Sequence, residues 1–221
     1  LTLLDEQPEL PEEDREKYIH ISLEKSIRLG ELISEFFEIT RFNLQDIVLQ
    51  KETLDISMML EQLADESYAV LAEKSLTCSI HTDDNLLVDA DPDKLARVFV
   101  NLRRNAIAYS DPGTNIDIRA FGEQKDIIIT FSNQGDQIPP QKLNFIFEKF
   151  YRVDNARQSR TGGAGLGLSI AKEIVELHGG AIAASSSPVC TRFTVKLPRH
   201  EEEQPAAAKK WGRIAKNGGK E

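Results

Sequence analysis

The sequence predicts an α+β fold in which helices cover one face of a sheet, preceded by a helical hairpin. A long helical pattern occupies residues 12–40. After it, strand-like segments come mostly as neighbouring pairs, with helical segments between the pairs. We therefore divide the chain into a partial helical hairpin at 1–44, a mixed domain at 45–198 and a tail at 199–221 that we expect to be disordered.

The N-terminal segment has the pattern of a helical hairpin. Residues 1–6 have the composition of a last helical turn, Pro8 and Pro11 interrupt it, and the long helix follows. Apolar residues of the long helix form one wide stripe of Leu29, Leu32, Ile33, Phe36 and Phe37. Such a stripe favours a dimeric four-helix bundle, and packing on the chain's own second domain is the alternative. Because the first residue is leucine, we expect a piece of a longer chain with a truncated first helix.

The first half of the mixed domain alternates strands with two helices. Strands are expected at 47–50, 76–81 and 86–89. A helix at 55–74 has one apolar face, formed by Ile56, Met59, Leu60, Leu63, Val70 and Leu71. A second helix starts at Asp91-Pro92-Asp93, where an N-cap aspartate precedes a proline. Its inward face is Leu95, Val98, Phe99, Leu102 and Ala106.

The second half of this domain predicts two hairpins with helices between them. The strands are expected at 116–120, 127–131, 181–187 and 191–197. Gly122 and nearby polar residues make the first hairpin turn, and Pro139-Pro140 opens a short helix. A polar loop at 151–164 then leads to a helix that Gly179-Gly180 ends.

A glycine-rich stretch leads directly into that last helix. Gly163, Gly165 and Gly167 alternate there, and glycine lets the backbone approach a ligand closely. The first amides of a helix attract anions, so the stretch favours phosphate binding. It has no Gly-Lys-Ser/Thr and follows no strand directly, which excludes a P-loop and a Rossmann turn. A flexible loop followed by a helix cap is the alternative.

Three asparagines occupy positions where the side-chain amide needs a hydrogen-bond partner or a ligand. Asn101 and Asn105 lie one turn apart inside a helix, where asparagine has mediocre propensity, and amide oxygens suit a Mg²⁺ that bridges phosphates. Asn133 ends the inward face of a buried strand, where its amide could meet the edge of adenine. Capping or surface asparagines and an ordinary strand end are the alternatives.

The stretch from Phe145 to Arg157 begins with closely spaced aromatic residues, and arginines follow them at intervals. This order favours an anchored lid that brings cations to phosphate.

The composition argues against other classes of protein. The net charge is −9, from 27 basic and 36 acidic residues, whereas a nucleic-acid binder normally has a basic face. No apolar run approaches the ~18 residues of a membrane span.

In order and spacing, these motifs together resemble the bacterial two-component sensor histidine kinases. Asn-x-x-x-Asn, Asn-x-Gly-x-x-Ile-Pro, Phe-x-Lys-Phe-Tyr-Arg and Gly-x-Gly-x-Gly-Leu are similar to the N, G1, F and G2 boxes of that family. Longer phrases at 37–45, 91–99 and 147–157 resemble its vancomycin-resistance branch. The resemblance covers roughly residues 1–198.

The resemblance implies a Bergerat-type ATP-binding domain behind a dimerisation hairpin, and it implies roles for the matching residues. Asn105 would be the main Mg²⁺ ligand, with Asn101 assisting, and Tyr109 would pack on the adenosine. Asn133 stands where most relatives have an adenine-binding aspartate. Arg157 would reach the phosphates from the lid, which makes it a catalytic residue beside Asn105. The other ATP-binding positions are Gly135, Ile138, Phe150, Gly163, Gly165, Leu166 and Gly167.

The sequence also departs from the family pattern. Besides Asn133, Gln137 replaces the second glycine of the G1 box, and Ala108 replaces a phosphate-directed lysine, so charge stabilisation would fall more on Arg157. The phosphoacceptor context His-Glu/Asp-x-Lys/Arg-Thr-Pro does not occur. His20 is followed by Ile-Ser-Leu-Glu-Lys, and we interpret it as a bundle histidine. We expect this chain to bind ATP without phosphorylating itself.

The resemblance implies the cytoplasmic kinase core of a membrane-bound sensor, a protein-histidine kinase that uses ATP and Mg²⁺. Its γ-phosphoryl group would pass to a bundle histidine of a homodimer and then to a response regulator. One alternative is a nucleotide-gated interaction module, or a degenerate kinase, that binds ATP without phosphotransfer. Another is an ATPase of the gyrase or chaperone type, which usually has an acid where Asn101 stands.

Overall fold

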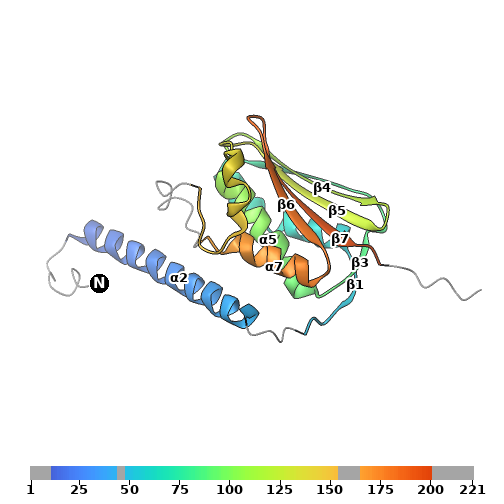
Figure 1. Cartoon of the computed structure of the whole chain (residues 1–221). Helices are drawn as coiled ribbons and strands as arrows, with labels where there is room; N and C mark the ends of the chain where they lie inside the picture. Colours follow the sequence, from blue (N-terminus) through green and yellow to red (C-terminus); the bar gives the residue numbers. More distant parts are fainter. Residues whose placement is uncertain (1–10, 44–47, 154–164, 201–221) are drawn as a thin grey trace, which may run out of the picture.

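The computed structural model describes residues 11–43, 48–153 and 165–200, and it shows one long helix followed by a layered α/β domain (Figure 1). A five-stranded mixed sheet has the spatial order β2-β4-β5-β7-β6. Its strands are β2 (Thr77–Thr82), β4 (Asn115–Glu123), β5 (Asp126–Asn133), β7 (Thr191–Pro198) and β6 (Ala181–Ser186). β2 pairs with β4 in parallel, and the other neighbours are antiparallel.

Helices cover one face of this sheet, and a two-stranded ribbon lies beside it (Figure 1). The covering helices are α3 (Ile56–Asp65), α4 (Tyr68–Glu73), α5 (Pro92–Tyr109) and α7 (Gly167–Leu177), and the long helix that precedes the domain is α2 (Glu12–Asn43). The ribbon pairs β1 (Glu52–Asp55) with β3 (Leu87–Ala90) in antiparallel fashion. Two 3₁₀ turns, η1 (Pro140–Lys142) and η2 (Phe145–Phe147), follow β5. The predicted α+β class is confirmed.

The core lies between the sheet and helices α5 and α7. Ile127, Ile129 and Phe131 of β5 alternate toward the helices and are fully buried, as is the predicted inward face of α5. The rings of Phe99 and Phe131 meet with centroids 6.0 Å apart, which joins α5 to the middle of the sheet. Burying one such side chain is worth about 1.5–3 kcal/mol, so this contact layer dominates the stability of the domain.

Asp91 starts α5 as the sequence predicts. Its Oδ1 accepts a hydrogen bond from the Lys94 backbone at 3.2 Å, which caps the helix. The same residue also joins distant parts of the chain. Oδ2 accepts from the Gln50 amide at 3.1 Å, and the Asp91 amide donates to Nε2 of His178 at 3.0 Å. Asp91 therefore fixes the chain segment before β1 to the beginning of α5 and the end of α7.

The helix predicted at 55–74 is divided into α3 and α4. The hydroxyl of Ser67 donates to the Leu63 carbonyl at 2.7 Å, and Arg103 of α5 donates to both groups. These side-chain bonds compete with the helical pattern, so the helix stops at residue 65 and restarts at 68. The predicted apolar face is wrong at Val70, which is 45% exposed.

Other boundaries also differ from the sequence-based expectations. The strand predicted at 47–50 is not found at 48–50, where the Gln50 amide bonds to Asp91 instead of a strand; the strand forms at β1. Gly122 lies inside β4, and the hairpin turns at Gln124, which adopts a left-handed φ of 56°. The short helix after Pro139 is a pair of 3₁₀ turns rather than one helix.

The two ends of the domain were predicted less well than its centre. Arg199 and His200 fall in the predicted tail, yet the Arg199 amide donates to the Lys125 carbonyl at 2.9 Å and the His200 amide to the Leu87 carbonyl at 2.8 Å. The rest of the tail, and the helical turn expected at 1–6, lie outside the described residues.

No helix in the described ranges combines the length and apolar content that crossing a bilayer requires.

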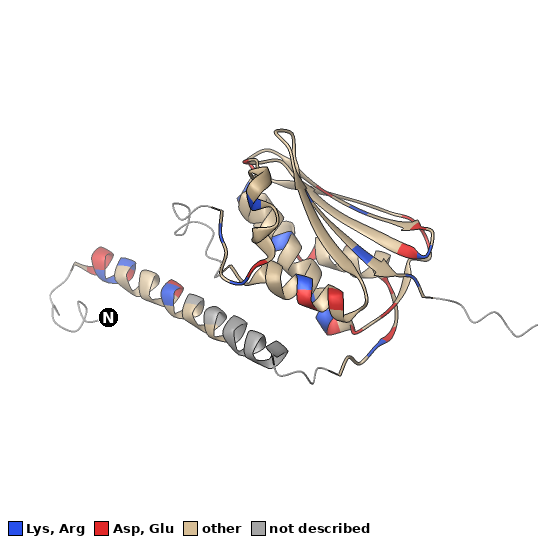
Figure 2. Ribbon diagram, in the orientation of Figure 1, with Lys and Arg blue, Asp and Glu red and all other residues tan. Residues whose placement is uncertain are grey.

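The helix predicted at 12–40 is confirmed as α2, and those of its apolar side chains that the structure describes are exposed. Leu29 and Ile33 of the predicted stripe are 57% and 47% exposed, so neither packs on the layered domain. The side chains of Leu32, Phe36 and Phe37 are not described. Lys and Arg are interspersed with Asp and Glu over the elements of the fold (Figure 2).

Candidate functional site

The beginning of α7 forms one end of the candidate site. Gly167 is its first residue, and no side chain of the described residues caps the helix, so its first amides lack an intrahelical partner. Gly165 has φ +77°, and a Cβ there would lie 2.9 Å from the Phe150 backbone. The Phe150 amide donates to the Gly165 carbonyl at 3.0 Å. Glycine is therefore required where two backbone segments meet before the helix.

Asn101 lies against this helix start. A Cβ on Gly167 would be 3.4 Å from Oδ1 of Asn101, so this side-chain amide lies directly beside the first residue of the helix. Nδ2 of Asn101 is buried and has no hydrogen-bond partner among the described residues. Asn105 is half-buried one turn further along α5. The unpaired Nδ2 donor and the uncapped backbone N–H groups fit phosphate oxygens, and Oδ1 of the same amide is the atom that suits a cation.

The donor set also fits Mg²⁺. The described residues contain no cluster of three or more His, Cys, Asp or Glu side chains that could hold a metal by themselves. A divalent ion at Asn101 and Asn105 would therefore bind amide oxygens together with oxygens of the nucleotide and water. Mg²⁺ commonly binds this way, since it keeps several waters and shares phosphate oxygens with few protein ligands.

A row of polar side chains lies at the other end of the site, where the inner face of the sheet ends. Asn133, Thr191 and Ser186 are register partners on β5, β7 and β6. Asn133 is 3% exposed, and its Oδ1 has no partner among the described residues. The hydroxyls of Thr191 and Ser186 are 2.7 Å apart, and Ser186 Oγ accepts from the Ile138 amide at 2.9 Å. We call Asn133, Thr191 and Ser186 the polar row.

Sequence reasoning missed Thr191 and Ser186. A signal was present for Thr191, because the inward run of Phe193, Val195 and Leu197 ends in it, as Ile129 and Phe131 end in Asn133. The pairing of β5 with β7, which places both polar ends side by side, joins segments about sixty residues apart and leaves no local pattern. The polar row can be recognised only from the register of the paired strands in the structure.

The turn after β5 packs on the end of α5. A Cβ on Gly135 would lie 2.0 Å from the Tyr109 carbonyl oxygen, and the Asp111 amide donates to the Gln134 carbonyl at 2.9 Å. This close approach keeps Tyr109, which is 38% exposed, beside the polar end of β5. Ile138 is half-buried against the core, and its amide is the one that bonds to Ser186.

The remaining predicted site residues divide into three cases. Phe150 is 61% exposed with a left-handed φ of 65°, so its ring is available to a ligand. Leu166 is 1% exposed, and its side chain belongs to the core. Arg157 and Gly163 lie outside the described residues.

Aromatic and ionic contacts hold the segment that leads toward residue 153. The rings of Phe147 and Phe193 pack edge to face, with centroids 6.4 Å apart. Lys149 forms an ion pair with Glu173 of α7 at 2.8 Å. The ammonium of Lys142 donates to the Val153 carbonyl at 3.0 Å. The predicted aromatic anchoring is therefore present on this side, and it ties the segment to α7 and β7.

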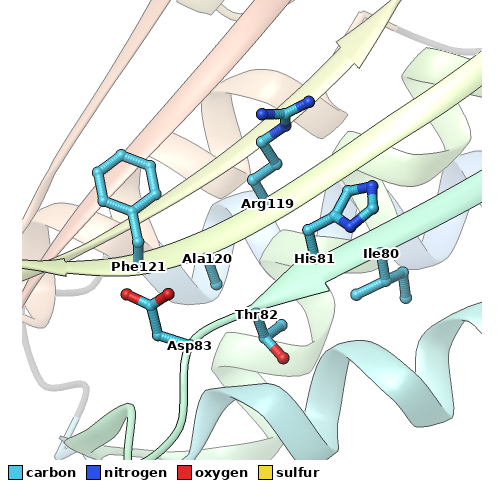
Figure 3. A pocket seen from close by; sticks show the side chains of 7 residues that line it. All are labelled: Ile80, His81, Thr82, Asp83, Arg119, Ala120 and Phe121. Carbon is cyan, nitrogen blue, oxygen red and sulfur yellow. The ribbon is translucent and has the colours of Figure 1, made fainter.

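A shallow pocket of about 510 Å³ lies elsewhere, over β2 and β4 (Figure 3). Figure 3 shows its side chains spread along the two strands, with His81 and Arg119 at one end and Asp83 and Phe121 at the other. Arg119 already bonds to Asp117 at 2.7 Å, and the Asp83 carboxylate accepts from the Gly122 amide at 3.3 Å. Because these polar groups are satisfied within the sheet, the pocket is a weaker candidate than the site above.

The family of the chain is decided by a family model. Residues 90–201, half of the chain, match the histidine kinase-, DNA gyrase B- and HSP90-like ATPases. The chain belongs to this family. It is also 54% identical over 199 residues to the sensor protein VanS of Enterococcus faecium, covering 90% of this chain and 51% of VanS. The chain thus spans about half the length of that relative, and the expected likeness to the vancomycin-resistance branch is confirmed.

Solved structures of sensor kinases have the same fold as this ATPase-family chain. One is histidine kinase ThkA in complex with the response regulator protein TrrA, with a TM-score of 0.73, 22% identity, and coverage of 90% of this chain and 55% of that one. Another is full-length ShkA in complex with AMPPNP, with a TM-score of 0.74, 23% identity, and coverage of 86% and 40%. At these identities, the likeness speaks for the fold alone.

Proposed function

We propose that this chain is the ATP-binding kinase core of a two-component sensor histidine kinase. The observation that carries the proposal is the contact of Asn101 with Gly167 at the uncapped start of α7. That contact brings an amide suited to Mg²⁺ together with backbone donors suited to phosphate. Membership of the ATPase family and the likeness to VanS support the same reading.

Each part of the site has a task in this proposal. Asn105 and Asn101 hold Mg²⁺, which neutralises phosphate charge when bound. The first amides of α7 orient the phosphates, and Asn133 and Tyr109 hold the adenosine. By the family resemblance, Arg157 adds a cation at the γ-phosphate. Such a site acts by positioning and charge neutralisation, since the transferred phosphoryl group needs little covalent help.

The acceptor in this proposal is a histidine on the dimerisation bundle of the whole protein, and the phosphoryl group then passes to a response regulator. The complex of the structurally similar ThkA with a response regulator supports this route. The exposed apolar side chains of α2 support a homodimer. The whole protein is proposed to be a membrane sensor whose kinase core faces the cytoplasm.

The metal test compares nucleotide binding with and without Mg²⁺. Asn105→Ala should weaken Mg·ATP binding by about tenfold to a hundredfold, a range typical of changes around a metal site, and should leave metal-free ATP binding nearly unchanged. Calorimetry measures both affinities. Asn144→Ala, an exposed asparagine whose side chain caps nothing, is the matched control. Equal losses with and without Mg²⁺ would contradict the metal role and indicate a folding role for Asn105.

Phosphotransfer is tested with γ-labelled ATP. The present sequence lacks the acceptor context, so it should bind ATP and acquire no acid-labile label. Extending the chain with the upstream helix of the bundle should restore labelling and dimerisation together. His20→Gln should change neither result. Acid-labile label on the present chain that disappears in His20→Gln would make His20 the acceptor. ATP binding with no labelling of the extended chain would instead favour a degenerate kinase.

A further inference from the structure

We infer that the polar row accepts a 6-oxopurine nucleotide as well as adenine nucleotides, so that ITP or GTP binds this site alongside ATP. The inference rests on the proposed function, since it assigns the base of the nucleotide to the polar row. It concerns the selectivity of the site, which the proposal of ATP binding leaves open. The observation behind it is that the row contains only amide and hydroxyl groups.

The amide of Asn133 can present either polarity to a ligand. Its oxygen accepts, its nitrogen donates, and a half-turn about the last side-chain torsion exchanges them. Oδ1 is buried without a partner among the described residues, and Asn133 as a whole is 3% exposed. An unpaired buried acceptor is costly, so a base that supplies a donor there gains affinity. Because Oδ1 has no hydrogen-bond partner among the described residues, no such bond fixes this oxygen in one orientation.

The two purine classes differ by just such an exchange. Adenine presents an amino donor at C6 beside the N1 acceptor, whereas a 6-oxopurine presents an acceptor at C6 beside an N1–H donor. An asparagine pairs with both by turning its amide. An aspartate offers only acceptors, so in the same pose it pairs with the adenine amino group and repels the 6-oxo oxygen. The asparagine therefore removes a basis for rejecting 6-oxopurines.

The hydroxyls of the row adapt in the same way. Ser186 Oγ already accepts from the Ile138 amide, and either hydroxyl of the pair with Thr191 can be the donor. When Ser186 donates to Thr191, the Thr191 proton is available to a ligand acceptor. When Thr191 donates to Ser186, its oxygen can accept from a ligand donor. None of the three side chains of the row is charged, so the row does not require the base to present only donors or only acceptors.

The test measures dissociation constants for Mg²⁺ complexes of ATP, ITP and GTP on the whole chain by calorimetry. We expect the unmodified chain to bind ITP or GTP within about tenfold of ATP. Asn133→Asp should retain ATP and weaken both 6-oxopurines by a further tenfold or more, because an acceptor would then face an acceptor. If both 6-oxopurines bind the unmodified chain more than about tenfold more weakly than ATP, the inference is wrong.

Controls separate this result from misfolding and from failure of the proposed function. Thr191→Val should weaken all the nucleotides, whereas Thr194→Val, on the same strand but the opposite face, should weaken none. Thermal unfolding shows whether each variant is folded, and the ratio in the unmodified chain decides the inference even if Asn133→Asp does not fold. A chain that binds no ATP at all would overturn the proposed function and this inference with it. A chain that binds ATP but rejects ITP and GTP overturns only the inference.

Discussion

Helices α2 and α5 carry apolar residues at the same helical spacing, yet their side chains have opposite surroundings. Leu95, Phe99 and Leu102 of α5 are fully buried against the sheet, whereas Ile27 and Leu29 of α2 are 58% and 57% exposed. Periodicity alone therefore predicts that a helix has an apolar face, and it does not say what covers that face. The sheet of the same chain covers α5, whereas the described apolar side chains of α2 are largely exposed.

This difference separates two sources of stability. The ATPase domain has its own core, so its folding should depend on α5 and little on α2. Exposed apolar side chains on α2 agree with the predicted dimeric bundle, which remains a prediction. Variants in the two regions should therefore have unequal effects on the domain.

The largest contrast is expected between Phe99→Ala and Leu29→Ala. Phe99 is fully buried against Phe131, so its truncation should lower the free energy of unfolding by about 3–5 kcal/mol. Leu29→Ala, at a side chain that is mostly exposed, should change it by less than about 0.5 kcal/mol. Urea denaturation measures both. Similar losses would show that α2 packs on the domain and would break the comparison.

Gly135→Ala should be the next most disruptive change, again inside the domain. The new Cβ would overlap the Tyr109 carbonyl oxygen, and relieving such an overlap costs about 1–3 kcal/mol. ATP affinity should fall too, because the polar end of β5 would move away from Tyr109. Gly113→Ala meets no neighbouring atom and pays mainly for its left-handed backbone, so it is the control for conformational strain. Unfolding and ATP titration of both variants give the comparison, and an unchanged affinity in Gly135→Ala would contradict it.

A smaller effect is expected at His178, where the segment that follows α2 meets the domain. Burial lowers the pKa of His178; Lys51 lowers it further, while the Ile174 carbonyl and Asp91 oppose the shift. Because the folded pKa is depressed, the unfolded chain binds more protons as pH falls below about 6.5, and the domain loses stability over that range. Thermal unfolding from pH 7.5 to 5 measures the slope.

His178→Gln removes this titration and should flatten the slope, since its amide oxygen can still accept from the Asp91 amide. His81→Gln, at an exposed histidine, is the control. An identical pH dependence in the unmodified chain and in His178→Gln would show that other groups carry the acid sensitivity.

The smallest effect belongs to α2 itself. Gly30 has no neighbouring atom where a Cβ would stand, and its backbone is helical. Gly30→Ala should therefore raise helix stability by up to about 1 kcal/mol through propensity alone. Circular dichroism should show a gain in helix content while the unfolding midpoint of the ATPase domain stays the same. A shift of that midpoint would mean that the two regions unfold together.

The sequence predicted the fold correctly where hydrophobic periodicity alone decides which side of an element is buried. The inward face of α5 is as predicted, because helical spacing follows directly from which side of the helix is buried. The break at Ser67 was not predictable, since it depends on Arg103 of another helix. The ribbon of β1 and β3 was likewise missed at its first strand, because its pairing is set by residues more than thirty positions away.

For the candidate site, the sequence indicated single residues better than their neighbours. Asn101 and Gly167 were chosen for separate reasons, and the structure places them together. Tyr109 and Gly135 were likewise chosen separately and lie in contact. Ser186 was not found, because a serine at the end of an edge strand has no distinctive pattern until its partner Thr191 is known.

The ribbon of β1 and β3 has a consequence for how such a domain can be joined to others. Glu52 of β1 pairs with Ala90, and the His200 amide donates to Leu87, so the chain enters and leaves at the same four-residue strand. A domain whose entry and exit points are adjacent can be spliced into another polypeptide without stretching either connection. A module attached after His200 would start beside β3, the strand that also pairs with β1. The fold thus suits insertion into a longer chain, because both of its connections lie at the same strand.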